Sequence, residues 1–243
     1  MPDDVAKAPE LPEAREPWLE PEPAMSLLDP RALQILSAEH SSLQSARSLA
    51  YNEAFTRAGM FLAFLSFSFV GLALVAQALP VGRDFLLVAT LVVAFDFVVG
   101  LTTYGRIIGT SHEDYLAVHG MARIRHGYGE IAPVVLPYFT TSVHDDLTGV
   151  MVSYGSPSTK GLSAIVYQLT TSGSMIGLIV AMIGGVLALV LSLVVGASVG
   201  VAFGAAVVGG LAVFILLAAV TVRFYFRVQA AMPVLYPTPP PVD

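Results

Sequence analysis

The feature that most constrains the fold is the segment from Gly161 to Val222, which contains no charged residue. A helix needs about 20 consecutive apolar residues to cross the hydrocarbon core of a bilayer, so this segment is long enough for two crossings and a turn. The whole chain is 55% hydrophobic and 12% charged, whereas soluble domains carry roughly 25% charged residues. The sequence therefore predicts an all-α integral membrane protein.

Two further apolar segments precede this one, which brings the predicted number of transmembrane helices to four. The spans are expected at about 58–79, 85–105, 173–195 and 199–222. The chain has no proline between Pro30 and Pro80, so one helix can run from outside the bilayer through the first span. Asp29 and Pro30 suit the N-cap and the first position of that helix.

A second long helix is expected to follow a tight turn at Pro80–Gly82, with Asp84 as its cap. It should continue from the membrane to about residue 131, so residues 30–131 form a long antiparallel hairpin. The halves of this hairpin outside the bilayer are expected to make a cytosolic helical stalk. Heptad spacing predicts the face of the first helix that packs in the stalk: Leu33, Leu36, His40, Leu43, Arg47 and Ala50.

The remaining segments are assigned by composition. Residues 1–25 combine many prolines and glutamates, which predicts a disordered acidic tail. Residues 132–161 are expected to form a cytosolic connector with one short amphipathic helix, opened by Ser142 and Asp145 in a capping-box-like arrangement. Residues 162–227 are expected to form a second membrane hairpin, and residues 228–243 an extended proline-rich tail.

The distribution of basic residues predicts the orientation, because cytoplasmic segments of membrane proteins carry an excess of lysine and arginine. Only Arg83 lies on the far side of the membrane from the stalk. The stalk side carries the others: Lys7, Arg15, Arg31, Arg47, Arg57, Arg106, Arg123, Arg125, Lys160, Arg223 and Arg227. We therefore expect a multi-pass protein of the bacterial plasma (inner) membrane with both termini in the cytoplasm.

Asp96 is the one charged residue within the predicted spans. A charged aspartate at the centre of a membrane helix costs about 2.5–3.5 kcal/mol on insertion scales. Pairing the first two helices back from their turn places Asp96 opposite Ser66 and Ser68. Two interpretations stay open. Either the carboxyl group is neutral and hydrogen-bonded to one of these serines, or Asp96, Ser66 and Ser68 form a titrating site for a proton or a cation.

Two rows of small residues recur at four-residue intervals in the predicted third and fourth spans. The rows are Gly173, Gly177, Ala181 and Gly185 in the third span, and Gly196, Gly200 and Gly204 around the start of the fourth. Small residues at this interval let helix backbones approach closely. The pattern, a glycine zipper, predicts tight packing of the two spans or of two copies of the chain, and a pore lined by these faces is the alternative.

Residues that commonly carry chemistry do not form a recognisable site. His112, His119 and His126 recur along the stalk, but two helical turns separate neighbours by about 10.5 Å, too far to share one metal ion. The run His144-Asp145-Asp146 is better explained by helix capping than by metal binding. The chain has no cysteine, and it shows no nucleophile motif and no phosphate loop. The sequence predicts no enzyme, no cofactor, no metal and no nucleic-acid partner.

Three segments carry a resemblance: "LSAEHSSLQSARSLAYNEAFTRAGMFL", "GLTTYGRI" and "GMARIRHGYGEIAPVVLPYFTTSVHDDLTGVMVSYG". In these segments the chain resembles uncharacterised actinobacterial integral membrane proteins with four spans, over about residues 27–222. The resemblance implies the four-span topology and assigns no functional residue. A second likeness is architectural: a cytosolic helix that leads into a membrane hairpin looks like the SLATT-type two-helix effectors of bacterial defence, which are thought to form pores.

These observations lead to two expected functions. The first is an interaction, accessory or scaffold protein that assembles through its stalk and its glycine-rich spans, in contact with the lipid bilayer and with a membrane complex or further copies of itself. The alternative is a proton- or cation-conducting pore in which Asp96 titrates.

Overall fold

The structure, a computed structural model, describes residues 27, 29–80, 82–155 and 171–240. Its helices are α1 (Pro30–Ala78), α2 (Arg83–Ile131), the 3-10 helix η2 (Pro133–Tyr138), α3 (Leu147–Ser153), α5 (Ser172–Val194) and α6 (Val199–Ala231). Four of them, α1, α2, α5 and α6, are long and apolar enough to cross a membrane. The predicted all-α membrane architecture with four spans is therefore confirmed. The predictions for residues 1–25 and 156–170 lie outside the described residues.

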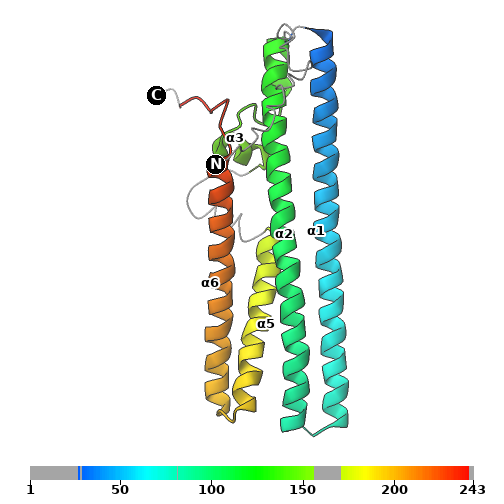
Figure 1. The fold of residues 1–243 in the computed structure, drawn as a ribbon, viewed down its shortest axis with the longest axis vertical. Helices are drawn as coiled ribbons and strands as arrows, with labels where there is room; N and C mark the ends of the chain where they lie inside the picture. Colours follow the sequence, from blue (N-terminus) through cyan, green and yellow to red (C-terminus); the bar gives the residue numbers. More distant parts are fainter. Residues whose placement is uncertain (1–26, 28, 81, 156–170, 241–243) are drawn as a thin grey trace, which may run out of the picture.

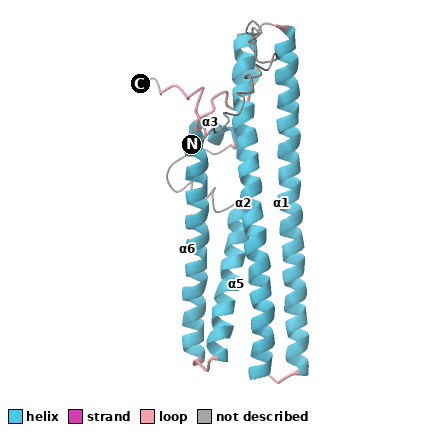
Figure 2. Cartoon of the chain, viewed as in Figure 1, coloured by secondary structure: helices cyan, strands magenta, loops and turns pink. Residues whose placement is uncertain are grey.

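The helices α1 and α2 form an antiparallel hairpin that extends along the whole length of the molecule (Figure 1, Figure 2). The carboxylate of Asp29 accepts the N–H of Arg31 at 2.8 Å and caps α1, with Pro30 in the first turn. Each helix has 49 residues and is therefore about 74 Å long, whereas the hydrocarbon core is only about 30 Å thick. The remaining length of both helices forms the stalk.

The start of α2 and the packing face of α1 differ from the prediction. Gly82 occupies the N-cap of α2 and Asp84 lies inside its first turn, so the predicted capping by Asp84 is wrong. An acid in the first turn is still favourable, because it complements the positive end of the helix dipole. On α1, Leu33 is exposed. Leu36 and Leu43 do face α2, where their methyl groups lie beside two glycines.

The helices α5 and α6 form a second, shorter antiparallel hairpin (Figure 1). The side chain of Thr171 accepts the N–H of Ser174 and caps α5. The turn between the two helices contains Gly196 with a φ of 86°, a left-handed conformation that glycine adopts without steric cost. The helix α2 packs against α1 on one side and α5 on another, and α5 packs against α6.

The membrane core forms where α1, α2 and α5 meet, and Gly100 of α2 lies at its closest approach. A Cβ atom added there would lie 2.9 Å from Val180 Cγ2 and 3.1 Å from Phe61 Cζ. A larger side chain would push the helices apart, which explains a glycine at this position. The buried residues of this core are Phe61, Leu65, Val93, Tyr104, Ile107, Ile176, Val180 and Ile183.

The connector between the two hairpins covers the stalk half of α2. The carboxylate of Asp146 accepts the N–H of Gly149 at 2.9 Å and caps α3, so the predicted capping by Ser142 and Asp145 is wrong. Val150 of α3 is completely buried. It packs in a second apolar cluster with Tyr115, Val118 and Met121 of α2. This contact fixes the connector on the stalk.

The C-terminal segment also folds back on the stalk, and α6 continues to Ala231, beyond the predicted start of the tail at residue 228. Asp145, which is 1% exposed, accepts the backbone N–H groups of Leu235 and Tyr236 at 3.0 and 2.7 Å. Arg123 donates to the same carboxylate at 2.8 Å and also to the carbonyl of Pro233. We call this arrangement of Arg123, Asp145 and residues 233–236 the tail clasp.

The electrostatics of the tail clasp explain why a carboxylate can be buried there. Burial alone would raise the pKa of Asp145, but the N–H of Leu235, the guanidinium of Arg123 and the N–H of Tyr236 outweigh it and hold the pKa below its ordinary value. The ring of Tyr236 adds a stacked contact with His126 at a centroid distance of 3.7 Å. The clasp therefore joins residues 233–236 to the C-terminal part of α2.

Candidate functional site

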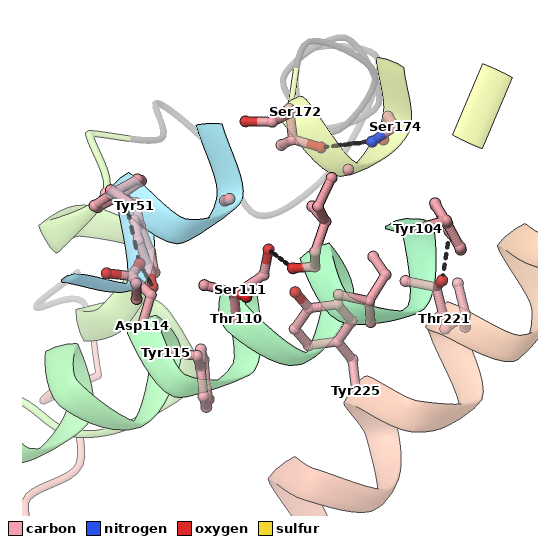
Figure 3. A pocket seen from close by; sticks show the side chains of 18 of the residues that line it. Tyr51, Tyr104, Thr110, Ser111, Asp114, Tyr115, Ser172, Ser174, Thr221 and Tyr225 are labelled. Atoms are coloured by element: carbon pink, nitrogen blue, oxygen red, sulfur yellow. Dashed lines mark hydrogen bonds between the residues drawn. The ribbon is translucent and has the colours of Figure 1, made fainter. Parts of the chain in front are cut away.

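A cavity of about 670 Å³ lies at the base of the stalk, between α1, α2, α3, α5 and α6. Its volume falls in the range of roughly 300–1,000 Å³ that is typical of small-molecule sites. Figure 3 shows polar side chains from three sides around the α2 segment that contains Asp114: Tyr51 from α1, Ser172 and Ser174 from α5, and Thr221 and Tyr225 from α6. We call it the stalk-base cavity.

Asp114 is the charged centre of this cavity, and it is only 6% exposed. Its carboxylate accepts a hydrogen bond from Arg47 Nε at 2.6 Å, from the hydroxyl of Tyr154 at 2.6 Å and from that of Tyr51 at 3.4 Å. The guanidinium of Arg47 also lies over the rings of both tyrosines, at 5.7 and 5.5 Å from their centroids. Three donors, one of which is the cationic Arg47, therefore satisfy the buried carboxylate.

These contacts join three separate parts of the chain, because Arg47 and Tyr51 lie on α1, Asp114 on α2 and Tyr154 at the end of α3. Burial, followed by the hydrogen bond and the negative charge of Asp114, raises the pKa of Tyr154 above its ordinary value. The tyrosine hydroxyl therefore stays protonated and acts as a donor. The cluster holds α1, α2 and the connector together on one side of the cavity.

The lower part of the cavity reaches the level at which the predicted spans end. Tyr104 of α2 and Thr221 of α6 share a hydrogen bond of 2.7 Å between their hydroxyl groups, and both side chains are buried. Ile107, Ile108 and Val222 line the cavity nearby and make this part apolar. The lining of the cavity is thus mainly apolar at the end near the predicted spans and polar at the end around Asp114.

A network of surface ion pairs lies on the hairpin where the first span begins and the second ends. Arg106 donates to both carboxylate oxygens of Glu53 at 2.8 Å, and Arg57 donates to one of them at 2.8 Å. These arginines lower the pKa of Glu53 to about 2. The network places charged groups directly beside the uncharged segments, at the predicted ends of the first two spans.

Asp96 lies within the membrane core, and its side chain is almost completely buried (2% exposed). The hydroxyl of Ser68 donates to its carboxyl group at 2.8 Å. Ser66 instead donates to the carbonyl of Leu62 on its own helix, also at 2.8 Å, so the structure brings Asp96 together with Ser68 and not with Ser66. Among the described residues, no basic side chain forms an ion pair with Asp96.

The two predicted rows of small residues have different surroundings. In α5, a Cβ atom added at Gly177 would lie 2.8 Å from Tyr104, and one at Gly185 would lie 2.7 Å from the carbonyl of Ala206 on α6. Gly173 and Ala181 are buried in the same row. In contrast, Gly196, Gly200 and Gly204 have no atom within 4 Å of an added Cβ, so this row packs against nothing in the described part of the chain.

Several residues that form the sites could not be recognised in the sequence. Asp114 stands in an ordinary stalk sequence, and only its partners on α1 and α3 identify it as a buried charge. The three stalk histidines have separate surroundings: His112 lies against Phe224, His119 near Asp145 and His126 on Tyr236. The described residues contain no group of three or more side chains that could hold a metal ion.

The chain matches no known protein family, no curated protein and no solved structure. The resemblance to four-span actinobacterial membrane proteins accordingly stays a prediction from the segments quoted above.

Proposed function

We propose that the protein is a membrane-anchored scaffold that assembles with further copies of itself through the stalk and the α6 span. It works without a catalytic site, and its connector and tail present a rigid surface at the end of the first hairpin. A conducting pore is the alternative class.

The observation that carries this proposal is an unpaired face on α1. In the stalk, α1 packs against α2 with the row that contains Leu36, Leu43 and Ala50. A second row, spaced at three and four residues, lies exposed on another side of the helix: Ile35, Ala38, Ser42, Ser45 and Leu49. The row has a large apolar residue at each end and three small residues between them, and such a surface is suited to close packing of a second helix. We call this row the outer seam.

The α6 span offers a second unpaired face in the membrane. Only 6% of its most apolar window is buried within the chain, compared with 44% for α5. The open row of Gly200 and Gly204 lies on this face. Lipid alone can cover such a helix, but small residues at this spacing permit a much closer approach of another helix. A copy of the chain supplies the same row, which makes a symmetric contact possible.

We also propose the bacterial inner membrane as the location, with both termini and the stalk in the cytoplasm. The supporting observation is the asymmetry of charge: Arg83 stands alone at the α1–α2 turn, whereas the stalk carries Arg31, Arg47, Arg123 and Arg125. Labelling of an introduced cysteine with a membrane-impermeant reagent tests this. A cysteine at Val134 should be labelled only in inverted vesicles, and one at Gly82 only in intact spheroplasts.

Cross-linking through introduced cysteines tests the assembly, because the chain has none of its own. Ser42→Cys in the outer seam should give a disulfide-linked dimer in native membranes. The matched control is Gln44→Cys, which is also exposed on α1 but lies on another side of the helix. In the membrane, Gly204→Cys should cross-link and Met182→Cys on the exposed face of α5 should not. Monomers from all four variants, in membranes and in mild detergent, would refute the scaffold proposal.

A conducting pore is the second candidate, and the buried Asp96 favours it because intramembrane carboxyl groups often mark ion pathways. The apolar surroundings oppose it: Ser68, its one hydrogen-bond donor among the described residues, otherwise lines a hollow of leucine, valine and phenylalanine side chains. Proton and cation flux into liposomes decides between the two. Flux that Asp96→Asn abolishes would establish conduction, with Asp84→Asn at the exposed turn as the control.

A further inference from the structure

The stalk-base cavity is lined by a tyrosine whose hydroxyl forms no hydrogen bond with the described residues. Tyr115 is 6% exposed and lines the cavity. Its hydroxyl has no hydrogen-bond partner among the described residues, unlike the hydroxyls of Tyr51, Tyr104 and Tyr154, which are all bonded. The buried polar atoms that lack a partner in the described part of the chain belong to His40, His112 and His144, so the Tyr115 hydroxyl is not completely covered. It is therefore free to form a hydrogen bond with a molecule in the cavity.

The charges of the lining residues restrict which kind of molecule the cavity can bind. Among the described lining residues, no lysine, arginine or histidine is present, so nothing there neutralises a phosphate or a carboxylate. The one charged lining group, Asp114, already receives hydrogen bonds from Arg47, Tyr51 and Tyr154 and needs no cation from a ligand. Burial of an unpaired charge would be strongly unfavourable, which leaves an uncharged head that forms hydrogen bonds.

The position of the cavity at the membrane surface indicates that the rest of the ligand is apolar. Its lining continues along α6 to Val222 and Phe226, both of which are exposed on the outside of the chain. Val222 is the last residue of the predicted fourth span, so this edge lies at the membrane surface. A hydrocarbon chain attached to the head can therefore pass over Val222 into the bilayer without crossing water.

We propose that the stalk-base cavity binds an uncharged membrane lipid, with a hydroxyl or carbonyl head beside Tyr115 and a hydrocarbon chain that leaves along α6. Diacylglycerols and prenyl alcohols carry the first type of head, and isoprenoid quinones the second. The occupant contacts α1, α2 and α6 together, so its binding also links the two hairpins at the membrane surface.

Photo-cross-linking of the full-length protein in nanodiscs tests this site. Two probes carry the same diazirine acyl chain, one on a diacylglycerol and one on an anionic phosphatidylglycerol. The diacylglycerol probe should label the α2 segment 104–115 and the α6 segment 222–229, and excess unlabelled diacylglycerol or menaquinone should compete. The better competitor identifies a hydroxyl or a carbonyl head. Labelling confined to the lipid-facing spans, or equal labelling of both segments by the anionic probe, would overturn the proposal.

Two variants separate a bound lipid from incidental contact. Tyr115→Phe keeps the volume of the side chain and removes the hydroxyl, and labelling should fall roughly fivefold, as expected for one hydrogen bond. Tyr138→Phe, on an exposed tyrosine of η2, is the matched control. Ala54→Leu should fill part of the cavity and reduce labelling, whereas Ala46→Leu on the exposed side of α1 should not. If Ala54→Leu does not fold, unchanged labelling of Tyr115→Phe alone refutes the site.

Discussion

The helices α1 and α2 have the same length of 49 residues, but α2 is largely covered by other parts of the molecule and α1 is largely exposed. Four residues of α1 are buried, whereas seventeen residues of α2 are. In the stalk, α1 has α2 as its packed neighbour, while α2 is covered by α1, by η2, by α3 and by the tail. Length and hydropathy therefore do not reveal which of two similar helices is buried. The segments that follow α2 in the sequence determine this, because they fold back mainly onto α2.

This difference also explains where polar groups can be buried. Asp96, Thr110, Asp114 and His119 are all buried on α2, and the buried residues of α1 are Ala32, Ala50, Phe61 and Leu65. A buried polar side chain requires a hydrogen-bond partner. Thr110 finds its partner within α2, at the carbonyl of Arg106, whereas Asp96 and Asp114 bind Ser68 and Arg47 of α1.

The largest effect is expected at the tail clasp, on the covered side of α2. Asp145→Ala removes the acceptor of Arg123 and of two backbone N–H groups. We expect the free energy of unfolding to fall by about 3–5 kcal/mol, as when one partner of a buried ion pair is removed. Denaturant unfolding in micelles measures this, and chymotrypsin should then cleave the tail after Leu235. Glu39→Ala, on the exposed face of α1, is the control, and a protease-resistant tail would contradict the prediction.

A pair of isoleucines compares the two helices directly. Ile124 of α2 is 6% exposed and Ile35 of α1 is 59% exposed, although both lie in the stalk. Ile124→Ala should cost about 2–5 kcal/mol, because it leaves a cavity in a packed region. Ile35→Ala should change the stability of the monomer by no more than about 0.5 kcal/mol. Equal costs in monodisperse detergent-solubilised protein would show that α1 is as covered as α2.

A smaller effect is expected on acidification, through His119 of α2. Burial, followed by the positive charge of Arg123, lowers the pKa of His119 below its ordinary value of 6.5, against the opposing charge of Asp145. As the pH falls through 6.5, the unfolded chain takes up a proton before the folded one does. Stability should therefore be constant above this pH and decrease below it. His119→Gln should remove part of the decrease and leave the part due to His40, whose pKa is also lowered by burial.

The smallest effect is expected for the surface network at Glu53. The bond with Arg106 and then that with Arg57 hold the pKa of Glu53 at about 2, below its usual value of 4.5. Its contribution is thus complete above pH 4.5 and is lost as the pH falls from 4.5 toward 2. Glu53→Gln should change thermal unfolding less than Ile35→Ala does, and 1 M salt should abolish the difference. A large, salt-independent loss would show that this exposed network supports the hairpin.

The architecture could be predicted because it depends on patterns that are local in the sequence. Uncharged segments of the right length predicted the spans, and the proline-free stretch from Pro30 to Pro80 predicted the continuous first helix. The antiparallel pairing back from the turn placed Asp96 opposite Ser66 and Ser68, and the structure contains the hydrogen bond with Ser68 but none with Ser66.

The polar sites could not be predicted because their partners are distant in the sequence. Asp145 and Asp146 are adjacent and chemically identical, yet only Asp146 caps α3. Asp145 accepts the backbone N–H groups of Leu235 and Tyr236, about ninety positions later, and Asp146 accepts the hydroxyl of Thr238. The sequence alone does not determine which carboxylate takes which role. In the same way, Asp114 resembles a solvated stalk residue until Arg47 and Tyr154 are placed beside it.

The tail clasp has a consequence for how the protein is made. Asp145 leaves the ribosome well before the segment with Leu235 and Tyr236, and the last two spans must be inserted in between. If either span failed to enter the membrane, residues 233–236 would emerge on the far side and the buried carboxylate would lack its donors. The clasp can therefore close only when both of these spans, or neither of them, have crossed the bilayer. A chain with a single misinserted span would be distinguished by an open, protease-accessible stalk.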